Sequence, residues 1–362
     1  MTILDQSRKM ALLDPQKMFG HVLDVPSHCQ DARFRVLNCP PHLKSGKINN
    51  VVISGVGGSA IGGDVLRTFL GKTTFFPITV NRHYELPAWV TKNTLVICSS
   101  YSGNTEETLS VFRQALSKKL PLLIVSSGGA LLKQAKHKKL PFCELPPGLQ
   151  PRAAFGYSFI TLLTALETSG FIPSFQNDFQ EALRLLVDFS KRYHFMEPAS
   201  RNQAKQLAMF FHNHIPVIYS GQDYFDSVSY RWKSQLNENA KQLALTSTIP
   251  EMNHNEILGY TFSEPLTKKM AVVLLRHPQK DHSQIEKRFD ILKKLIHSKV
   301  FGIREVEARG NSVLAQMLST IYLGDFVTVY LAYLKGVDPT PIDLIDQFKS
   351  LLSQAQKSAK RT

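Results

Sequence analysis

LVICSSYSGNTEET, residues 95–108, joins a buried-strand pattern to a loop of hydroxyl side chains and then to a helix. Its first three residues are apolar and typical of a short strand, while Glu106 and Glu107 open an amphipathic helix. Strands that alternate with helices in this way are typical of α/β proteins. The stretch therefore predicts the fold class, and the same pattern returns on both sides of it.

The loop within this stretch is suited to binding an anion. The first backbone N–H groups of a helix have no intrahelical partner, and the helix dipole favours negative charge beside them. Gly103 lets the backbone approach a ligand closely, and Ser100, Ser102 and Thr105 add hydroxyl donors. Ordinary helix capping needs only one hydroxyl and the following Glu. Hydroxyls on both sides of a glycine therefore favour a phosphate-binding loop over a simple cap.

A second loop of related type follows the apolar stretch NVVIS, residues 50–54, and contains Gly58 and Ser59 in a glycine-rich turn before a helix. Such a turn suits a pyrophosphate, but its glycines do not keep the GxGxxG register. The next strand pattern ends in Asn81 and Arg82 rather than in the acid that binds a dinucleotide ribose. A dinucleotide-dependent dehydrogenase is therefore disfavoured.

Further strands are predicted at residues 122–126 and 142–145, with helices at 106–120 and 131–137 between and beside them. Such alternation predicts a parallel sheet covered on both faces, with ligands at the carboxyl ends of its strands. The two loops should therefore converge on one pocket. A second alternation from about residue 216 onward predicts another α/β domain. We expect lead-in helices and a first domain in 1–150, and a second domain with a C-terminal helix in 151–362.

Composition limits the function classes. The chain has 362 residues, with 43 basic and 29 acidic side chains and a formal net charge of +14. Its basic clusters lack interleaved aromatic residues and match no nucleic-acid motif, so we expect no nucleic-acid partner but an anionic small substrate. Four scattered cysteines without CxxC spacing argue against a structural zinc and against a disulfide framework. We find no apolar run of membrane-spanning length and no secretory signal pattern, and expect a cytoplasmic protein with no membrane contact.

Three further residues are candidates for chemistry, although their local patterns alone favour surface roles. Glu238 lies in the helical pattern RWKSQLNENAK, residues 231–241, and His254 lies in the polar loop PEMNHNEILGY, residues 250–260. A carboxylate base and a histidine suit proton abstraction beside a carbonyl and opening of a sugar ring. Arg152 is a lone cation before an apolar helix, and it could face either solvent or the cleft.

Taken in order, six motifs resemble those of the bifunctional phosphoglucose/phosphomannose isomerases, which are built from two sugar-isomerase (SIS) domains. They are SGVGGSAIGGD, SSYSGNTEET, PRAAFGYSF, RWKSQLNENAK, PEMNHNEILGY and LKGVDPTPID. The resemblance spans nearly the whole chain and implies two SIS domains, each a mainly parallel sheet between helices in a flavodoxin-like three-layer sandwich. Val56 stands where Met is common in the family, which bears on substrate preference rather than on the reaction.

The resemblance also implies roles for particular residues. Glu238 is implied as the base that moves a proton between C1 and C2, His254 as the group that helps open the ring, and Arg152 as the cation near the developing enediolate. Phosphate and substrate contacts are implied for Gly58, Ser59, Ser100, Ser102 and Thr105. In the C-terminal motif, Lys349 is implied near the ring oxygen, and Thr340 is implied to leave room for either C2 epimer.

The expected activity interconverts glucose 6-phosphate, and mannose 6-phosphate, with fructose 6-phosphate, without cofactor or metal. The resemblance implies a homodimer in which His254 crosses into the other subunit's site. The alternative is a sugar-phosphate-binding SIS regulator without turnover. A regulator should carry a nucleic-acid module, and the two α/β units absorb the whole sequence.

Overall fold

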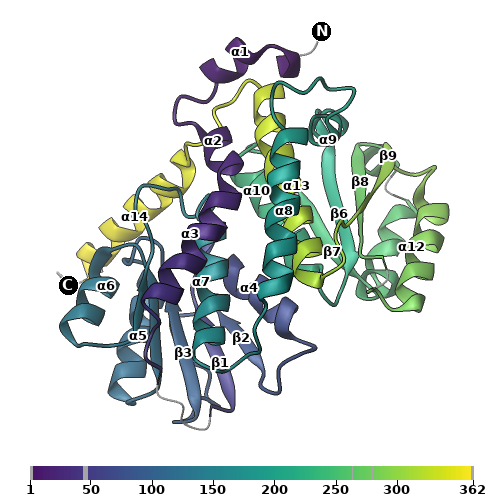
Figure 1. The fold of residues 1–362 in the computed structure, drawn as a ribbon. Coiled ribbons are helices and arrows are strands. Elements are labelled where there is room, and N and C mark those ends of the chain that lie inside the picture. The colour runs from purple at the N-terminus through teal and green to yellow at the C-terminus, as the bar shows by residue number, and fades with distance from the viewer. Residues whose placement is uncertain (1–2, 44–47, 263, 279, 360–362) are drawn as a thin grey trace.

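The computed structural model describes residues 3–43, 48–262, 264–278 and 280–359. Two parallel sheets, each flanked by helices, lie side by side in the molecule (Figure 1). The first is five-stranded in the order β2-β1-β3-β4-β5, with β1 (Asn50–Ser54), β2 (Ile78–Asn81), β3 (Thr94–Ser99), β4 (Leu122–Ser126) and β5 (Phe142–Glu144). The second is four-stranded in the order β7-β6-β8-β9, with β6 (Ile215–Gly221), β7 (Leu245–Ile249), β8 (Met270–Arg276) and β9 (Gly302–Glu307). The predicted α/β class with two parallel sheets is confirmed.

The inner strands are apolar along their whole length because helices cover both faces of each sheet. Every residue of β3 is buried, and its register places Val96 beside Val52 of β1 and beside Leu122 of β4. Parallel strands covered on both sides lose the alternation of an amphipathic strand and show continuous hydrophobic runs. This is why the short apolar stretches in the sequence predicted strands correctly.

The helices follow the strands in the alternation expected from the sequence. Their bounds are α1 (Ser7–Leu12), α2 (Met18–Leu23), α3 (Val25–Asn38), α4 (Gly58–Leu70), α5 (Glu106–Ser117), α6 (Gly129–His137), α7 (Phe155–Thr168), α8 (Gln176–Arg192), α9 (Gln203–Phe211), α10 (Asp226–Glu238), α11 (Glu264–Thr267), α12 (Ser283–Ile296), α13 (Val313–Leu334) and α14 (Asp343–Ala359). Short 3-10 helices cover Ile3–Asp5, Glu251–His254 and Glu256–Tyr260. The polar loop that carries His254 therefore has local helical structure.

α13 is the central helix of the second half of the molecule. It packs against α8, α9 and α10, and it is apolar around its whole circumference because neighbours surround it. Its 22 residues are long and apolar enough to cross a membrane, and 94% of its most apolar window is buried inside the protein. The sequence-based expectation that no apolar run has that length was wrong for this helix, whose apolar surface is explained by core packing.

Contacts between α4 and α10 join the two halves of the molecule. Arg67 Nη2 of α4 lies 2.8 Å from Asp226 Oδ2 of α10, and the hydroxyls of Thr68 and Ser227 are 2.7 Å apart. α4 begins at the carboxyl edge of the first sheet, directly after β1. The interface therefore places the second half of the chain beside the loops of the first sheet.

Candidate active site

The first sheet has the strand order 2-1-3-4-5 of flavodoxin-like folds, in which ligands bind where the loops after β1 and β3 separate. The two loops predicted from the sequence lie at this point. Ser59 Oγ accepts a hydrogen bond of 2.9 Å from the backbone N–H of Tyr101, and Ser99 Oγ donates to the carbonyl oxygen of Ser59 at 3.2 Å. The loops are therefore in direct contact, and their convergence on one pocket stays a prediction.

The hydroxyls of the second loop are not used to cap the following helix. Thr105 holds the N-cap position of α5, but its side chain makes no cap bond and instead lies 2.8 Å from Ser100 Oγ. Ser100 is buried and also accepts from the backbone N–H of Gly103 at 3.1 Å, whereas Ser102 is exposed. No side chain therefore caps the first N–H groups of α5, and they remain available to an anion. This distinguishes a ligand-binding loop from an ordinary helix cap.

Two glycines permit the close backbone approaches of this site. Gly103 has φ +68°, and a Cβ there would lie 1.9 Å from the carbonyl oxygen of Gly128. A Cβ on Gly58 would lie 2.8 Å from the backbone nitrogen of Arg152. Any larger residue at Gly58 would push the segment that carries Arg152 away from the start of α4.

Arg152 is buried at the junction of the two halves. Its Nε donates to Asn239 Oδ1 at 2.6 Å, and its Nη2 donates to the carbonyl oxygens of Pro339 and Thr340 at 2.9 and 2.8 Å. Its Nη1 lies 3.6 Å from Glu238 Oε2. Burial lowers the pKa of the guanidinium, and the neighbouring Glu238 carboxylate opposes that shift. Between the solvent and cleft positions left open by the sequence, the structure selects the cleft.

The backbone of Arg152 is held by a buried ion pair. Arg231 donates to the carbonyl oxygen of Arg152 at 3.2 Å and pairs with Asp325 of α13 at 2.7 Å. Burial raises the pKa of Asp325, and the Arg231 charge and the Gln235 amide oppose that shift. The polar face of α10 is therefore buried against α13, and its charge spacing is not the surface pattern that is usual for helices.

Glu238, the last residue of α10, has a side chain that is 27% exposed and opens into a small pocket between the two halves. The pocket is lined from both sides, by Gly57, Gly58, Ile61, Arg82, Arg152, Tyr230, Arg231, Ser234, Gln235 and Glu238. From the sequence, Arg82 was considered only because it stands where a dinucleotide-binding protein has an acidic residue. Its position directly after β2 was the signal that it could be a second cation of this pocket. The pocket thus combines one carboxylate with several guanidinium groups.

The segment after α13 forms one wall around Arg152. Thr340 is buried, and its Oγ1 has no hydrogen-bond partner among the residues that the structure describes. Lys241 donates to the carbonyl oxygens of Glu238, Asp338 and Pro339 at 2.8 to 3.0 Å, which ties α10 to this segment. Burial lowers the pKa of Lys241 to about 8, and repulsion from Arg152 adds to this. The sequence indicated Lys241 only as a polar residue at helical spacing from Glu238 and assigned it no role in the site.

Ser59, Ser100, Ser102 and Thr105 do not line this pocket, and His254 and Lys349 lie away from it within one chain. His254 is exposed and follows β7, whereas Glu238 precedes β7, so the two residues lie at opposite ends of a five-residue strand. That length corresponds to roughly 13 Å. Lys349 lies on α14 with a side chain that is 64% exposed, 3.7 Å from Asp346 of the same helix. Glu238, Arg152, Gly58 and Thr340 are thus assembled by the chain itself, and His254 and Lys349 are not.

Comparisons with known proteins agree with this architecture. A model of the "Bacterial phospho-glucose isomerase C-terminal SIS domain" family matches residues 200–352. A bifunctional phosphoglucose/phosphomannose isomerase of Caldicellulosiruptor bescii is 41% identical over 337 residues, which cover 93% of this chain and 99% of that protein. Another of Aquifex aeolicus is 36% identical over 307 residues, covering 84% of this chain and 90% of that protein.

Among solved structures, a glucose-6-phosphate isomerase-like protein of Thermus thermophilus superposes with a TM-score of 0.63 at 19% identity. The superposition covers 96% of this chain and 98% of that one. At this identity the likeness concerns the fold alone.

Proposed function

Because the chain belongs to the bifunctional phosphoglucose/phosphomannose isomerase family, we propose that it interconverts glucose 6-phosphate and mannose 6-phosphate with fructose 6-phosphate. The observation that carries this proposal is the pair of Glu238 and buried Arg152, 3.6 Å apart beside the loop that contains Gly58. One group is a base, and the other is a fixed cation where negative charge would develop.

In the proposed reaction the opened aldose presents its C2 proton to the Glu238 carboxylate. Removing that proton while O1 is protonated gives a C1=C2 enediol, and returning a proton to C1 with loss of the O2 proton gives the ketose. The electrons stay within the substrate, so no redox cofactor is required. The Arg152 guanidinium, already ordered by Asn239 and two carbonyl oxygens, would stabilise the negative charge that develops on the substrate oxygens during these proton transfers, without reorganisation.

We assign the substrate's phosphate to the start of α5 and the loop after β3. Ser100, Ser102 and Thr105 supply hydroxyls there, and the helix dipole adds a favourable field. Ser59 belongs to the same surface through its contact with Tyr101. Thr340 Oγ1, buried without a described partner, is the hydroxyl we place near C2, where glucose and mannose differ.

We also propose a cytoplasmic homodimer in which each site receives His254 from the partner. One chain holds Glu238 and His254 at opposite ends of β7, so a symmetric second copy is the simplest source of the histidine. Leu258 and Phe262, close to His254 in sequence, are 72% and 95% exposed. Large apolar side chains that are exposed in one chain are available to a protein interface. No nucleic acid or membrane enters this proposal.

The direct test is Glu238→Gln, assayed with each aldose 6-phosphate in a coupled assay and by calorimetric binding of fructose 6-phosphate. The amide keeps the shape and loses the basic lone pair, so we expect turnover to fall by about 10²- to 10⁴-fold while binding changes little. Glu264→Gln, at an exposed position of α11, is the matched control and should leave turnover unchanged. Turnover of Glu238→Gln within about tenfold of the native protein would remove Glu238 from the base role.

A further inference from the structure

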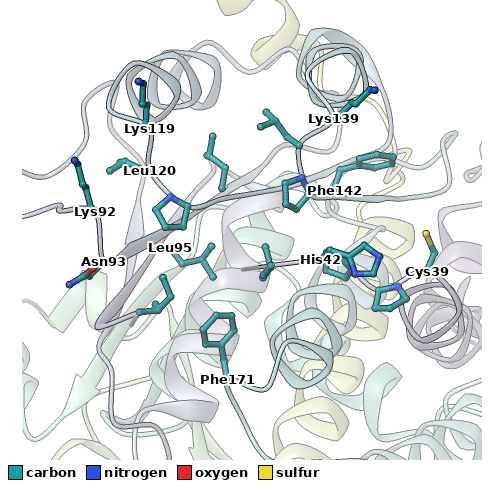
Figure 2. Close-up of a pocket in the computed structure, with 18 residues that line it drawn as sticks. Cys39, His42, Lys92, Asn93, Leu95, Lys119, Leu120, Lys139, Phe142 and Phe171 are labelled. Carbon is teal, nitrogen blue, oxygen red and sulfur yellow. The ribbon is translucent and has the colours of Figure 1, made fainter. Parts of the chain in front are cut away.

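A second and larger cavity lies at the opposite edge of the first sheet, where its strands begin (Figure 2). It encloses about 710 Å³ and includes Leu95 at the start of β3 and Phe142 at the start of β5. The phosphate loop follows the other end of β3, which has six residues and spans roughly 16 Å. The cavity is therefore separate from the candidate active site.

The body of the cavity is apolar. Leu95, Leu120, Phe142 and Phe171 line it from different segments of the chain, as Figure 2 shows. Leu95 and Phe171 belong to the hydrophobic core on one face of the sheet, and Leu120 and Phe142 belong to the core on the other. Prolines at four further lining positions carry no backbone N–H donor. A cavity of this size with mainly apolar walls is typical of sites that bind small organic molecules.

Cations stand at the rim. Lys92, Lys119 and Lys139 are exposed, and no acidic residue is among the described residues that line the cavity. In Figure 2, Lys92 and Lys119 lie at the left and upper left and Lys139 at the upper right, with their ammonium groups directed outward from the hollow. The rim therefore presents an uncompensated positive charge beside an apolar interior. Lysine side chains are long and flexible enough to meet a head group at such an opening.

Two of these lysines occupy backbone positions that favour glycine. Lys119 and Lys139 follow α5 and α6 with φ +51° and +52°, each in the repeated sequence KKLP. A side chain in this left-handed conformation is strained relative to glycine. A cation there also complements the end of its own helix. Lys92 does not follow a helix, however, so a favourable interaction with a helix dipole cannot be the reason for a lysine at all three rim positions.

We propose that this cavity binds a soluble amphiphilic anion, a carboxylate or phosphate carried on a single apolar chain. The chain would lie against the apolar lining, and the anionic head would meet lysine side chains on one side of the opening. An uncharged apolar molecule makes no use of the rim, and a sugar phosphate has no apolar body for the interior. The site thus has a ligand class different from that of the isomerase site.

Cys39 provides a built-in reporter of occupancy. It is exposed and lines the cavity, whereas Cys29, Cys98 and Cys143 are buried, and burial raises the pKa of each of their thiols to about 12. An uncharged alkylating reagent such as monobromobimane should therefore label Cys39 first. Cys39→Ala establishes the background rate of labelling at the other three.

The test measures alkylation of Cys39 in the full chain with monomeric decanoate or decyl phosphate. We expect either anion to slow labelling by about tenfold or more, with decanol much weaker and fructose 6-phosphate without effect. Equal protection by decanol, protection by fructose 6-phosphate, or no protection by the anions would overturn the proposal. Protection by phosphatidylglycerol vesicles alone would overturn it as well, because the ligand would then be a membrane surface.

The variant Lys92→Ala/Lys119→Gly/Lys139→Gly tests the rim by calorimetry with decanoate. Glycine suits the backbone at both helix ends, so the fold should be preserved. We expect affinity to fall about tenfold or more, while the matched control Lys118→Ala/Lys138→Ala, whose lysines lie outside the cavity lining, should bind as the native protein does. Native affinity in the triple variant, or an equal loss in the control, would contradict the assignment. Isomerase activity is measured separately and does not bear on this outcome.

Discussion

Arg152 is the residue on which the contacts of the candidate active site converge. Its side chain binds Asn239 and the carbonyl oxygens of Pro339 and Thr340, and its own carbonyl accepts from Arg231. A planar fork of donors is needed to make these bonds together, and the ammonium group of lysine does not provide one. The orientation of the cation is therefore set before substrate arrives, which is the condition for efficient electrostatic stabilisation.

At the same scale, we expect Ser102→Ala/Thr105→Ala to raise KM for glucose 6-phosphate by about tenfold or more, with a smaller change in kcat. The phosphate is bound in both the ground state and the transition state, so its loss acts mainly on binding. Steady-state kinetics provide the measurement. Ser117→Ala, at the far end of α5, is the control, and an unchanged KM in the double variant would move the phosphate site elsewhere.

The buried His277 is the basis of a second prediction, which concerns how the stability of the protein depends on pH. It is fully buried, its ring stacks on Phe225, and burial lowers its pKa to about 4 from an ordinary value of 6.5. Between these values the unfolded chain binds more protons, so this group's contribution to stability is lost as pH falls from 6.5 to 4. Lys72, Lys280 and Asp223 also act on it electrostatically. The loss is on the order of 3 kcal/mol.

Asp281, which accepts from the backbone N–H of His277, acts in the opposite direction. Burial raises its pKa to about 6, so its contribution improves as pH falls from 6 to 3.8. His277→Leu removes only the histidine contribution. We therefore expect the stability of His277→Leu relative to the native protein to rise by roughly 3 kcal/mol from pH 7 to pH 4 in urea unfolding. Parallel curves for the two proteins would contradict this.

At the scale of elements, α10 and α14 illustrate opposite uses of a helix. α10 is packed between α4 and α13, and this packing positions Glu238, its last residue, in the lining of the pocket. α14 carries large apolar side chains that the rest of the chain does not cover, with Leu344 80% and Phe348 66% exposed. An amphipathic helix whose apolar face is uncovered in one chain is suited to contact with another copy.

We accordingly predict that Phe348→Ser/Leu351→Ser weakens dimer formation by about tenfold or more without lowering the stability of the monomer, because neither side chain is packed in one chain. Sedimentation analysis over a range of concentrations measures the association. Ser350→Ala, on the same exposed helix, should associate as the native protein does. Unchanged association of the double variant would remove α14 from the interface.

At the scale of the whole molecule, the positions of Glu238 and His254 on either side of β7 require a second chain if both serve one site. Inactive Glu238→Gln and inactive His254→Ala chains should then regain activity when mixed, because one of the two sites in a heterodimer receives both native groups. Each variant carried alone through the same subunit exchange is the control. No recovery after verified exchange would overturn the shared site and leave the isomerase assignment intact.

Much of this architecture follows from local patterns. The apolar runs at 50–54, 95–97 and 122–126 predicted strands because doubly covered parallel strands have no polar face. The hydroxyl loop was visible as well, because a phosphate site built from a helix start uses residues that are neighbours in sequence. The roles of Glu238 and His254 came from the family resemblance, since charge spacing and a polar loop alone favoured surface positions.

What only the tertiary structure decided is how distant segments combine. Arg152 meets Asn239, 87 residues later, and the carbonyl of Thr340, 188 residues later, and no local periodicity encodes such pairs. From the sequence, the polar face of α10 could be exposed to solvent or buried against a partner, because the same charge spacing fits both. The ion pair of Arg231 with Asp325 of α13 shows that it is buried. The separation of Glu238 from His254 is likewise a tertiary feature, because it depends on the direction of β7, the strand that lies between the two residues in the chain. Side-chain chemistry is local in sequence, whereas burial and pairing belong to the packed chain.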